Sequence, residues 1–278
     1  MKAAVLGQPI AHSLSPVMHR AAYEALGLTD WSYEIVECDE AGLPGYVTSR
    51  GPDWAGLSLT MPLKRAVLPL LDHVDPLAAA TGGANTVVFR PEGRHGYNTD
   101  VQGIADALAE AGAPAAPGNV TILGAGATAC SALAAVAQLG AATADVLVRD
   151  PSRAAGLLAA AERLGMRVRL RRFDEPAGAS APDLLISTLP AGAADFYPGR
   201  ALLAPPPPAT VFDVVYSPWP TRLAQAASAT GVTVVRGFTM LLHQAVAQVE
   251  LMTGKPAPVE AMRAAGEAEI ARREAAGA

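Results

Sequence analysis

Short apolar runs and stretches with helical spacing alternate along the first part of the chain. Strand-like runs occupy residues 3–6, 32–38 and 55–60. Residues 16–27 have apolar positions at helical spacing, with Pro16 suited to the first turn of a helix and Gly27 to its end. This alternation is typical of βαβ units on a parallel sheet.

A further extended pair lies at 85–90 and 94–98, around a turn at 91–93. Asp100 then precedes apolar positions at helical spacing over 101–112, so we expect its carboxylate to cap that helix. The alanine and proline segment 113–118 comes next, and its composition is typical of a joint between domains.

A second α/β series begins after this joint. Its predicted strands are 119–123, 145–149, 167–173, 183–189 and 210–216. Helical stretches such as 129–140 and 152–165 separate them, which is the order of elements in a doubly wound parallel sheet. Two further helices are predicted at 238–254 and 259–278.

Composition and charge narrow the classes of function. The chain has 278 residues, 51% of them hydrophobic, and can bury a sizeable core. Its formal net charge of -5 provides no basic surface for nucleic acid or anionic lipid, so we expect a small-molecule partner. Cys38 and Cys130 are too few for a disulfide framework and form no CxxC pair, which indicates a reducing compartment and no structural metal.

Two apolar stretches bear on the location of the protein. Near the N-terminus, Gly7, Pro9 and His12 interrupt the apolar run that a secretory signal would need. Residues 120–144 carry no charge, but their glycines, threonines and Gln138 fit a buried strand, turn and helix better than a membrane span. We therefore expect a cytoplasmic protein.

One turn in the second series has the spacing of a dinucleotide-binding site. Gly124, Gly126 and Ala129 form a GxGxxA arrangement directly after a predicted strand and before an alanine-rich helix. The first glycine permits the tight turn, the second lets a diphosphate approach the backbone, and the alanine keeps helix and strand close. Free amides at the helix N-terminus attract the diphosphate, so the predicted contacts are Gly124, Ala125, Gly126 and Ala127.

The residues after the next predicted strand bear on which dinucleotide binds. Arg149 and Arg153 could hold the 2′-phosphate of NADP, whereas Asp150 could accept hydrogen bonds from the 2′-hydroxyl of NAD and would repel a facing phosphate. Asp150 could equally cap the next helix. The sequence therefore predicts a nicotinamide dinucleotide and leaves both NADP and NAD open.

Several motifs in the first series resemble the shikimate dehydrogenase family. GQPIAHSLSPVMH is similar to the family's opening signature, which implies that Ser13 and Ser15 bind a substrate carboxylate. Two hydroxyls and the amides at a loop-to-helix junction can solvate a carboxylate without a buried arginine. GLSLTMPLK resembles the family pattern GxNVTxPxK, which implies a catalytic Lys64 and a substrate contact from Thr60.

Later motifs keep the order that they have in the family. GANTVVF and GYNTDVQG imply that Asn85 binds substrate and that Asp100 is the acidic partner of the catalytic lysine. FDVVYSPWPT and GFTMLLHQA imply that Tyr216 lies near the substrate, that Gln244 bonds one of its hydroxyls and that Gly237 lies near the nicotinamide. The resemblance therefore extends over nearly the whole chain.

The chain departs from the family pattern at a few positions. Ser58 and Leu59 stand where asparagine and valine are usual. Ala127 stands in place of a glycine in the cofactor turn, and Cys130 stands where a basic residue is common. One diphosphate contact of the family is accordingly missing here.

The resemblance implies a fold and a reaction. The fold is an N-terminal α/β substrate-binding domain, residues 1–101 with 238–278 packing back on it, plus a Rossmann-type doubly wound NAD(P)-binding domain, residues 102–237. The reaction is the reversible NADPH-dependent reduction of 3-dehydroshikimate to shikimate, in the shikimate pathway of aromatic amino-acid biosynthesis. No metal is expected, and a monomer and a homodimer both fit.

Two alternative functions remain open from the sequence. One is a quinate/shikimate dehydrogenase that prefers NAD, which Asp150 favours. The other is a non-catalytic relative that binds dinucleotide as a regulatory module, against which the presence of both Lys64 and Asp100 argues. A methylene-tetrahydrofolate dehydrogenase also has two α/β lobes and a lysine, but it would not explain the SxSP and NTD motifs.

Overall fold

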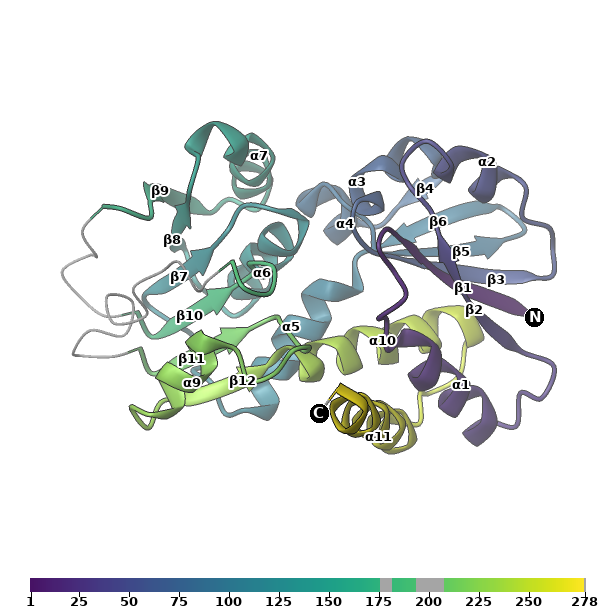
Figure 1. The fold of residues 1–278 in the computed structure, drawn as a ribbon. Coiled ribbons are helices and arrows are strands. Elements are labelled where there is room, and N and C mark those ends of the chain that lie inside the picture. The colour runs from purple at the N-terminus through teal and green to yellow at the C-terminus, as the bar shows by residue number, and fades with distance from the viewer. Residues whose placement is uncertain (176–181, 194–207, 278) are drawn as a thin grey trace. The chain divides into compact units, whose positions relative to one another are not determined.

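The computed structural model describes residues 1–175, 182–193 and 208–277 (Figure 1). The chain divides into two units: unit 1 comprises Met1–Thr99 and Leu241–Ala278, and unit 2 comprises Asp100–Met240. It passes between the units within two helices, α5 (Thr99–Glu110) and α10 (Gly237–Thr253). Each unit has its own α/β fold around one six-stranded sheet.

Unit 1 is built on a mixed sheet. Its strands are β1 (Lys2–Gly7), β2 (Ser32–Glu37), β3 (Trp54–Leu59), β4 (His73–Val74), β5 (Thr86–Arg90) and β6 (Gly93–Tyr97), in the spatial order β2-β1-β3-β5-β6-β4. β1 runs parallel to β2 and β3, whereas β5 runs antiparallel to β3 and β6. The carboxyl ends of β1, β3 and β6 and the amino end of β5 therefore lie at one edge of the sheet, the site edge.

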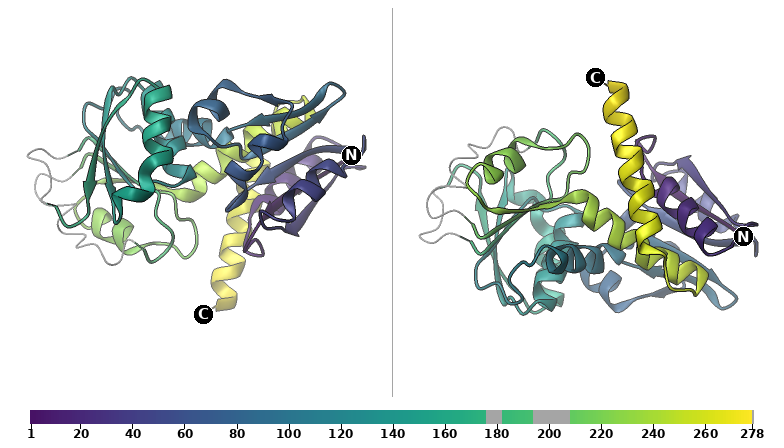
Figure 2. Two further views of the ribbon diagram at one scale, coloured as in Figure 1. Left: turned by 90° about the horizontal axis from the view of Figure 1, so that it is seen from above. Right: turned by 90° about the horizontal axis from the view of Figure 1, so that it is seen from below.

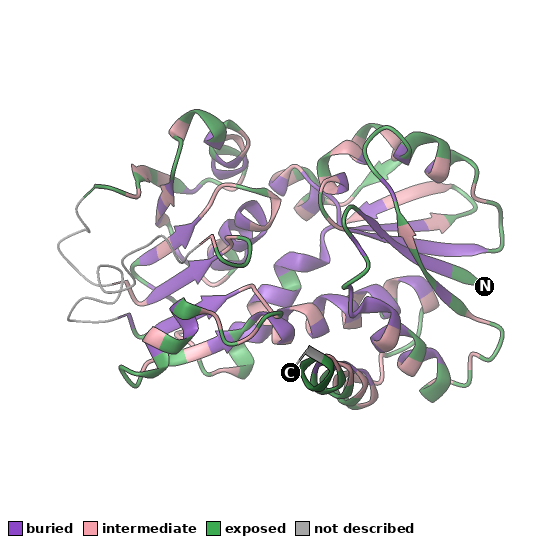
Figure 3. Cartoon of the chain, in the orientation of Figure 1, coloured by how far each residue is buried: buried purple, intermediate pink, exposed green. Residues whose placement is uncertain are grey.

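Helices cover both faces of this sheet because strand side chains point alternately to opposite sides. Ala4 and Leu6 of β1 pack on the face covered by α2 (Leu43–Thr48), α3 (Leu63–Ala66) and α4 (Pro76–Thr81). Ala3 and Val5 pack on the opposite face, in one cluster with residues of α1 (Ser15–Ala25) and α10. Figure 3 shows the resulting buried strands between partly exposed helices.

The first helix of unit 1 begins and ends as its sequence predicts. Pro16 lies in the first turn of α1, where its missing amide hydrogen costs nothing. Gly27 follows the helix with a φ of 68°, and the amide of Leu28 donates to the carbonyl of Tyr23 at 2.8 Å. The last helix, α11 (Val259–Gly277), lies beside α1 (Figure 2).

Unit 2 is built on a parallel sheet. Its strands are β7 (Val120–Leu123), β8 (Thr143–Val148), β9 (Arg167–Arg172), β10 (Leu184–Ser187), β11 (Thr210–Asp213) and β12 (Thr233–Arg236). The spatial order is β12-β11-β10-β7-β8-β9, and every neighbouring pair is parallel. When these six strands are numbered 1 to 6 from β7 to β12 and the sheet is followed from β9 to β12, the order is 3-2-1-4-5-6, which is the Rossmann arrangement. Helices α6 (Ala127–Gln138), α7 (Ala155–Arg163) and α9 (Arg222–Ser228) connect described strands.

The predicted α/β class and the doubly wound second sheet are confirmed, and several short elements are additional. These are β4, β12, α3, α4, α9 and the 3-10 helix η1 (Leu68–Leu70), while the predicted helical stretch 152–165 begins as the 3-10 helix η2 (Pro151–Ala154). The prediction that Asp100 caps a helix is wrong. Helix α5 already begins at Thr99, whose amide is held by Asn85, so Asp100 lies inside the first turn.

The uncharged stretch 120–144 forms a strand, a turn and a helix of unit 2. Its residues are largely buried in that unit, in agreement with the prediction. Within the described parts of the chain, every helix is too short or too polar to cross a lipid bilayer.

Candidate active site

Most of the predicted substrate contacts lie at the site edge of unit 1. Ser13 and Ser15 follow β1, and Thr60 and Lys64 follow β3. Asn85 immediately precedes β5, which is antiparallel to β3. The sheet topology therefore gathers at one edge residues that are far apart in the sequence.

The two serines form a compact turn at the start of α1. The Ser15 amide donates to Ser13 Oγ at 3.2 Å, and the Ser13 amide donates to the carbonyl of Ile10 at 2.9 Å. Both serines are buried, and Leu14, the cap position of the helix, makes no side-chain capping bond. The hydroxyls thus lie beside the amides of a helix N-terminus, which favours an anionic group.

Thr60 and Lys64 are held by backbone bonds on both sides of the turn after β3. The Thr60 amide donates to the carbonyl of Leu6 at 2.9 Å, which fixes the turn to the end of β1. The Ala84 amide donates to the Lys64 carbonyl at 2.8 Å, which fixes α3 to the segment before Asn85. A Cβ atom at Gly7 would overlap Thr60 Cγ2, so a side chain at this position would force the Thr60 side chain to move. The backbone of Lys64 is therefore positioned from two strands.

Asn85 joins the site edge to α5 and α10. Its Oδ1 accepts from the Thr99 amide at 2.8 Å and from Thr86 Oγ1 at 2.9 Å. Its Nδ2 donates to Thr99 Oγ1 at 2.9 Å and to Gln244 Oε1 at 3.3 Å. The structure thus brings Asn85 and Gln244 together, as expected for two groups that contact one ligand, and places Asp100 next to the Thr99 that Asn85 holds.

A buried polar network next to these residues was not foreseen from the sequence. Gln248 is 1% exposed, and its Oε1 accepts from Ser58 Oγ at 2.8 Å and contacts His19 Nε2 at 3.3 Å. Its Nε2 donates to Thr86 Oγ1 at 2.9 Å, and Tyr33 donates to Ser58 Oγ at 2.7 Å. Gln248 lies one helical turn after Gln244, and that spacing was the available signal.

Burial dominates the ionisation of this network. Burial lowers the pKa of His19 to about 3, and the hydrogen bond to Gln248 offsets only part of that effect. Burial also raises the pKa of Tyr33 well above its usual range. Both rings are stacked with their centroids 4.0 Å apart and are neutral at physiological pH. Ser58, which stands where asparagine is usual, thus has two neutral partners, Tyr33 and Gln248.

The predicted dinucleotide turn has the geometry that its spacing implies. Gly124 has a φ of 101°, and a Cβ there would lie 2.8 Å from Thr188 Oγ1, so a side chain is excluded. Gly126 precedes α6, and a Cβ there would meet nothing within 4 Å. Ala129 is fully buried against the strand. The backbone beside Gly126, Ala127 and the start of α6 is therefore open to a ligand.

Asp150 is engaged by the helix that follows it. Its Oδ1 accepts from the Ser152 amide at 3.0 Å and from Ser152 Oγ at 2.6 Å. These bonds hold the pKa of the Asp150 carboxyl below its usual value. Of the two roles left open by the sequence, the structure has the carboxylate capping η2, while Arg149 and Arg153 are exposed beside it.

The remaining predicted residues also belong to unit 2. Tyr216 is half-buried and follows β11, whereas Gly237 is buried at the start of α10. A Cβ at Gly237 would overlap the carbonyl of Val214, so this position also requires glycine. Among the described residues no group of three or more His, Cys, Asp or Glu side chains could hold a metal ion.

The fold and the turn after β7 define the class: an α/β protein that carries a Rossmann-type sheet. A family model described as the shikimate dehydrogenase substrate binding domain matches residues 5–87, and one described as the shikimate 5'-dehydrogenase C-terminal domain matches residues 237–265.

Relatives and solved structures match over most of the chain. A shikimate dehydrogenase (NADP(+)) of Moorella thermoacetica is 36% identical and covers 93% of this chain and 90% of its own length. The crystal structure of Mycobacterium tuberculosis shikimate dehydrogenase is 44% identical, with a TM-score of 0.87, and covers 96% of this chain and 99% of its own. A Thermus thermophilus shikimate 5-dehydrogenase in complex with NADP(H) and shikimate is 34% identical, with a TM-score of 0.84 and coverage of 96% and 99%. The chain belongs to the shikimate dehydrogenase family.

Proposed function

We propose that this chain catalyses the reversible NADPH-dependent reduction of 3-dehydroshikimate to shikimate, a step of aromatic amino-acid biosynthesis. The observation that carries the proposal is the gathering of polar residues at the site edge of unit 1. The sheet topology brings together Ser13, Ser15, Thr60, Lys64 and Asn85, and a hydrogen bond adds Gln244. This set can hold a carboxylated ring with several hydroxyls.

Each end of the substrate has matching groups. The Ser13 and Ser15 hydroxyls, with the first amides of α1, bind the carboxylate. The side-chain amides of Asn85 and Gln244 can each donate and accept, which suits ring hydroxyls. Thr60 adds a further hydroxyl contact. Substrate binding is thus assigned to unit 1.

Unit 2 holds the dinucleotide in this proposal. The backbone from Gly124 to Ala127 fits a diphosphate because the space at Gly126 is empty and the N-terminus of α6 has no side-chain cap. Arg149 and Arg153 bind the 2′-phosphate of NADP, since the Asp150 carboxylate is held by Ser152. Gly237, which leaves no side chain in the way, lies by the nicotinamide, and Tyr216 lies by the substrate.

Lys64 and Asp100 carry the proton chemistry. When bound, NADPH supplies the hydride that reduces the substrate carbonyl. The Lys64 ammonium donates a proton to the oxygen of that carbonyl, and in the reverse direction its neutral amine accepts the proton. Asp100 orients the ammonium and binds a neighbouring hydroxyl.

The test is turnover by a Lys64→Ala variant. We expect kcat to fall by at least about a hundredfold, the low end for a positioned acid or base. Binding of NADP, measured by fluorescence titration, is expected to stay at the parent value because Lys64 belongs to unit 1. Lys255→Ala removes an exposed lysine of the same unit and is the control. Turnover of Lys64→Ala near that of the control would remove Lys64 as the proton carrier.

Rates with shikimate and quinate, each with NADP and with NAD, separate this proposal from an NAD-preferring quinate/shikimate dehydrogenase. We expect shikimate with NADP to be the best pair. No turnover with any pair, despite dinucleotide binding, would favour a regulatory relative. A cytoplasmic location and a monomeric or homodimeric state remain predictions.

A further inference from the structure

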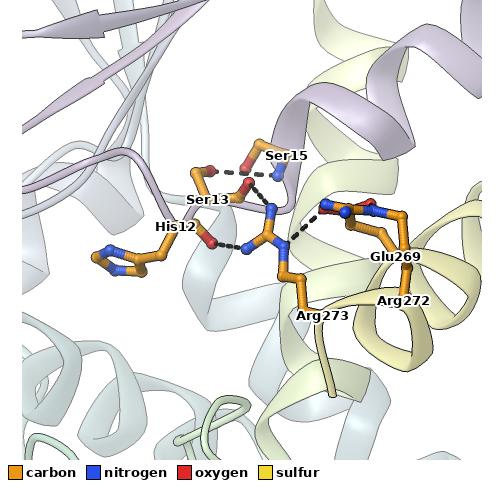
Figure 4. A network of polar contacts seen from close by, with 6 residues as sticks. All are labelled: His12, Ser13, Ser15, Glu269, Arg272 and Arg273. Atoms are coloured by element: carbon orange, nitrogen blue, oxygen red, sulfur yellow. Dashed lines mark hydrogen bonds and ion pairs between the residues drawn. The ribbon is translucent and has the colours of Figure 1, made fainter. Parts of the chain in front are cut away.

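The C-terminal helix reaches back to the serine turn of unit 1 (Figure 4). Arg273 of α11 donates from Nη1 to the carbonyl of His12 at 2.5 Å and from Nη2 to the carbonyl of Ser13 at 3.3 Å. Its guanidinium is planar and rigid, so two such bonds fix both distance and direction. A residue near the end of the chain therefore holds the turn that precedes α1.

Glu269 fixes the guanidinium from the other side. Its Oε1 accepts from Arg273 Nε at 2.7 Å, and Arg272 donates to the same carboxylate from Nε at 2.7 Å. Hydrogen bonds from Arg272 and then Arg273 lower the pKa of Glu269 to about 2, so the carboxylate is charged at physiological pH. Glu269 carries one negative charge against the two positive charges of Arg272 and Arg273, and Arg273 reaches the turn through the carbonyls of His12 and Ser13.

The two carbonyls that Arg273 binds set the orientation of the serines. In a trans peptide the carbonyl and the following amide hydrogen point in opposite directions. Holding the Ser13 carbonyl toward α11 therefore turns the Leu14 amide away from α11 and fixes the plane next to the Ser13 side chain. The bonds within the turn itself are short-range, from Ser13 to Ile10 and from Ser15 to Ser13.

We propose that Arg273 is a positioning residue that orients the Ser13–Ser15 turn for the substrate carboxylate. This inference rests on the proposed function, because it assigns a support to the carboxylate site of that function. Arg273 contacts the backbone of the turn from α11, whereas Ser13 and Ser15 bind the carboxylate. It extends the substrate site to a helix that the sequence motifs do not include.

The experiment compares shikimate with its methyl ester, which lacks the negative charge of the carboxylate. Dissociation constants for both are measured by calorimetry on parent, Arg273→Ala and Arg272→Ala. We expect Arg273→Ala to bind shikimate roughly tenfold more weakly, the effect of one lost hydrogen bond to a charged group, and to bind the ester within about twofold of parent. We expect the KM for shikimate of Arg273→Ala to rise by the same factor as its dissociation constant. Its kcat and its KM for NADP should stay within about twofold of parent.

Arg272→Ala is the matched control because Arg272 pairs with the same glutamate, whereas Arg273 also bonds the carbonyls of His12 and Ser13. Its preference for shikimate over the ester should equal that of the parent. Arg273→Lys keeps the charge but cannot hold two carbonyls in one plane, so it should restore only part of the preference. This variant also serves as the test if Arg273→Ala does not fold.

The outcomes separate the two proposals. An unchanged preference for shikimate over the ester in Arg273→Ala, or in Arg273→Lys where only that variant folds, would overturn the positioning role. A parent protein that shows no preference for the acid, together with a Ser13→Ala/Ser15→Ala variant that binds shikimate as the parent does, would instead overturn the carboxylate site of the proposed function.

Discussion

In the proposed function, the two units recognise their ligands by different means. At the site edge of unit 1 the proposed contacts are mainly side chains, and most are buried and already hydrogen-bonded, as Asn85 is to Gln244. At the turn of unit 2 the proposed contacts are backbone groups, left accessible by the absence of a side chain at Gly126. A ring with hydroxyls at fixed positions needs oriented partners, whereas a diphosphate needs only amides and space.

The largest expected effect breaks the side-chain network of unit 1. Gln248→Ala leaves His19, Ser58 and Thr86 without their shared partner in a buried place. Unsatisfied buried polar groups are costly, so we expect the free energy of unfolding to fall by about 3 kcal/mol. Urea unfolding monitored by tryptophan fluorescence measures this decrease in the free energy of unfolding.

The control for this change is an exposed glutamine on a helix of unit 2. Gln225 lies on α9, and its side chain donates to the carbonyl of Pro220 at 3.3 Å. Gln225→Ala should alter the unfolding free energy by less than about 0.5 kcal/mol. Equal effects of the two substitutions would show that the unit 1 network adds nothing to stability.

The contrast between the turn of unit 2 and the side-chain network of unit 1 also explains which features could be predicted from the sequence. The turn of unit 2 is local, because its strand, glycines and helix follow one another, and the spacing of Gly124, Gly126 and Ala129 is sufficient to find it. The long strands could be predicted for the same reason, since an apolar run bounded by turn residues is visible in the chain. Strands and helices as short as β4 and α3 show no period in their apolar positions, so they could not be predicted.

The network of unit 1 could be predicted only in part, because its members meet only in the fold. His19 and Gln248 are 229 residues apart, and Ser58 and Gln248 are 190 apart. Arg273 lies 260 residues beyond Ser13. The family resemblance supplied the expected ligand contacts, but the residues that hold those contacts carry no motif.

The second prediction separates two glycines of the dinucleotide turn. Gly126→Ala adds a methyl group where nothing lies within 4 Å, so the melting temperature should stay at the parent value. The methyl group occupies the space that the diphosphate needs, so we expect NADP to bind at least about tenfold more weakly, the loss of one charge-assisted hydrogen bond or more. Thermal unfolding and fluorescence titration provide the two measurements.

Gly124→Ala is the companion variant and should behave differently. Its φ of 101° and the contact with Thr188 make a side chain unfavourable, so both stability and NADP binding are lowered. If Gly126→Ala bound NADP as tightly as the parent, the diphosphate would not lie at this turn.

The third prediction uses pH to probe the buried histidine of unit 1. His19 has a pKa of about 3 in the folded protein because it is buried, whereas an unfolded histidine has a pKa near 6.5. Between these values the unfolded chain binds a proton that the folded protein does not, so stability is lost as pH falls. The loss is about 1.4 kcal/mol per pH unit, or roughly 2 kcal/mol between pH 6.5 and 5.

Unfolding free energies of parent and His19→Asn over this pH range test the assignment. The variant should lose about 2 kcal/mol less than the parent between pH 6.5 and 5. His12→Asn replaces an exposed histidine and is the control. The carboxyl pKa values of Asp72 and Glu269 are lowered in the folded protein, so the stability they contribute is lost as pH falls below about 5, at the lower limit of the range measured. If the unfolding free energy of His19→Asn fell with pH as steeply as that of the parent, His19 would not be the group responsible for the pH dependence.

The smallest expected effect concerns Asp150, the residue that left the choice of cofactor open. If its carboxylate faced the ribose, Asp150→Ala would shift the preference strongly from NAD toward NADP, because a repelling charge beside the 2′-phosphate would be gone. In the structure the carboxylate is bound to Ser152 instead, so the NADP/NAD ratio of kcat/KM should change by no more than about fivefold, as for an exposed charge.

Arg149→Ala and Arg153→Ala should each lower the same ratio by more than Asp150→Ala changes it, because an arginine donates directly to the phosphate. A large gain in the ratio for Asp150→Ala would place the carboxylate at the ribose, where it would oppose the two arginines.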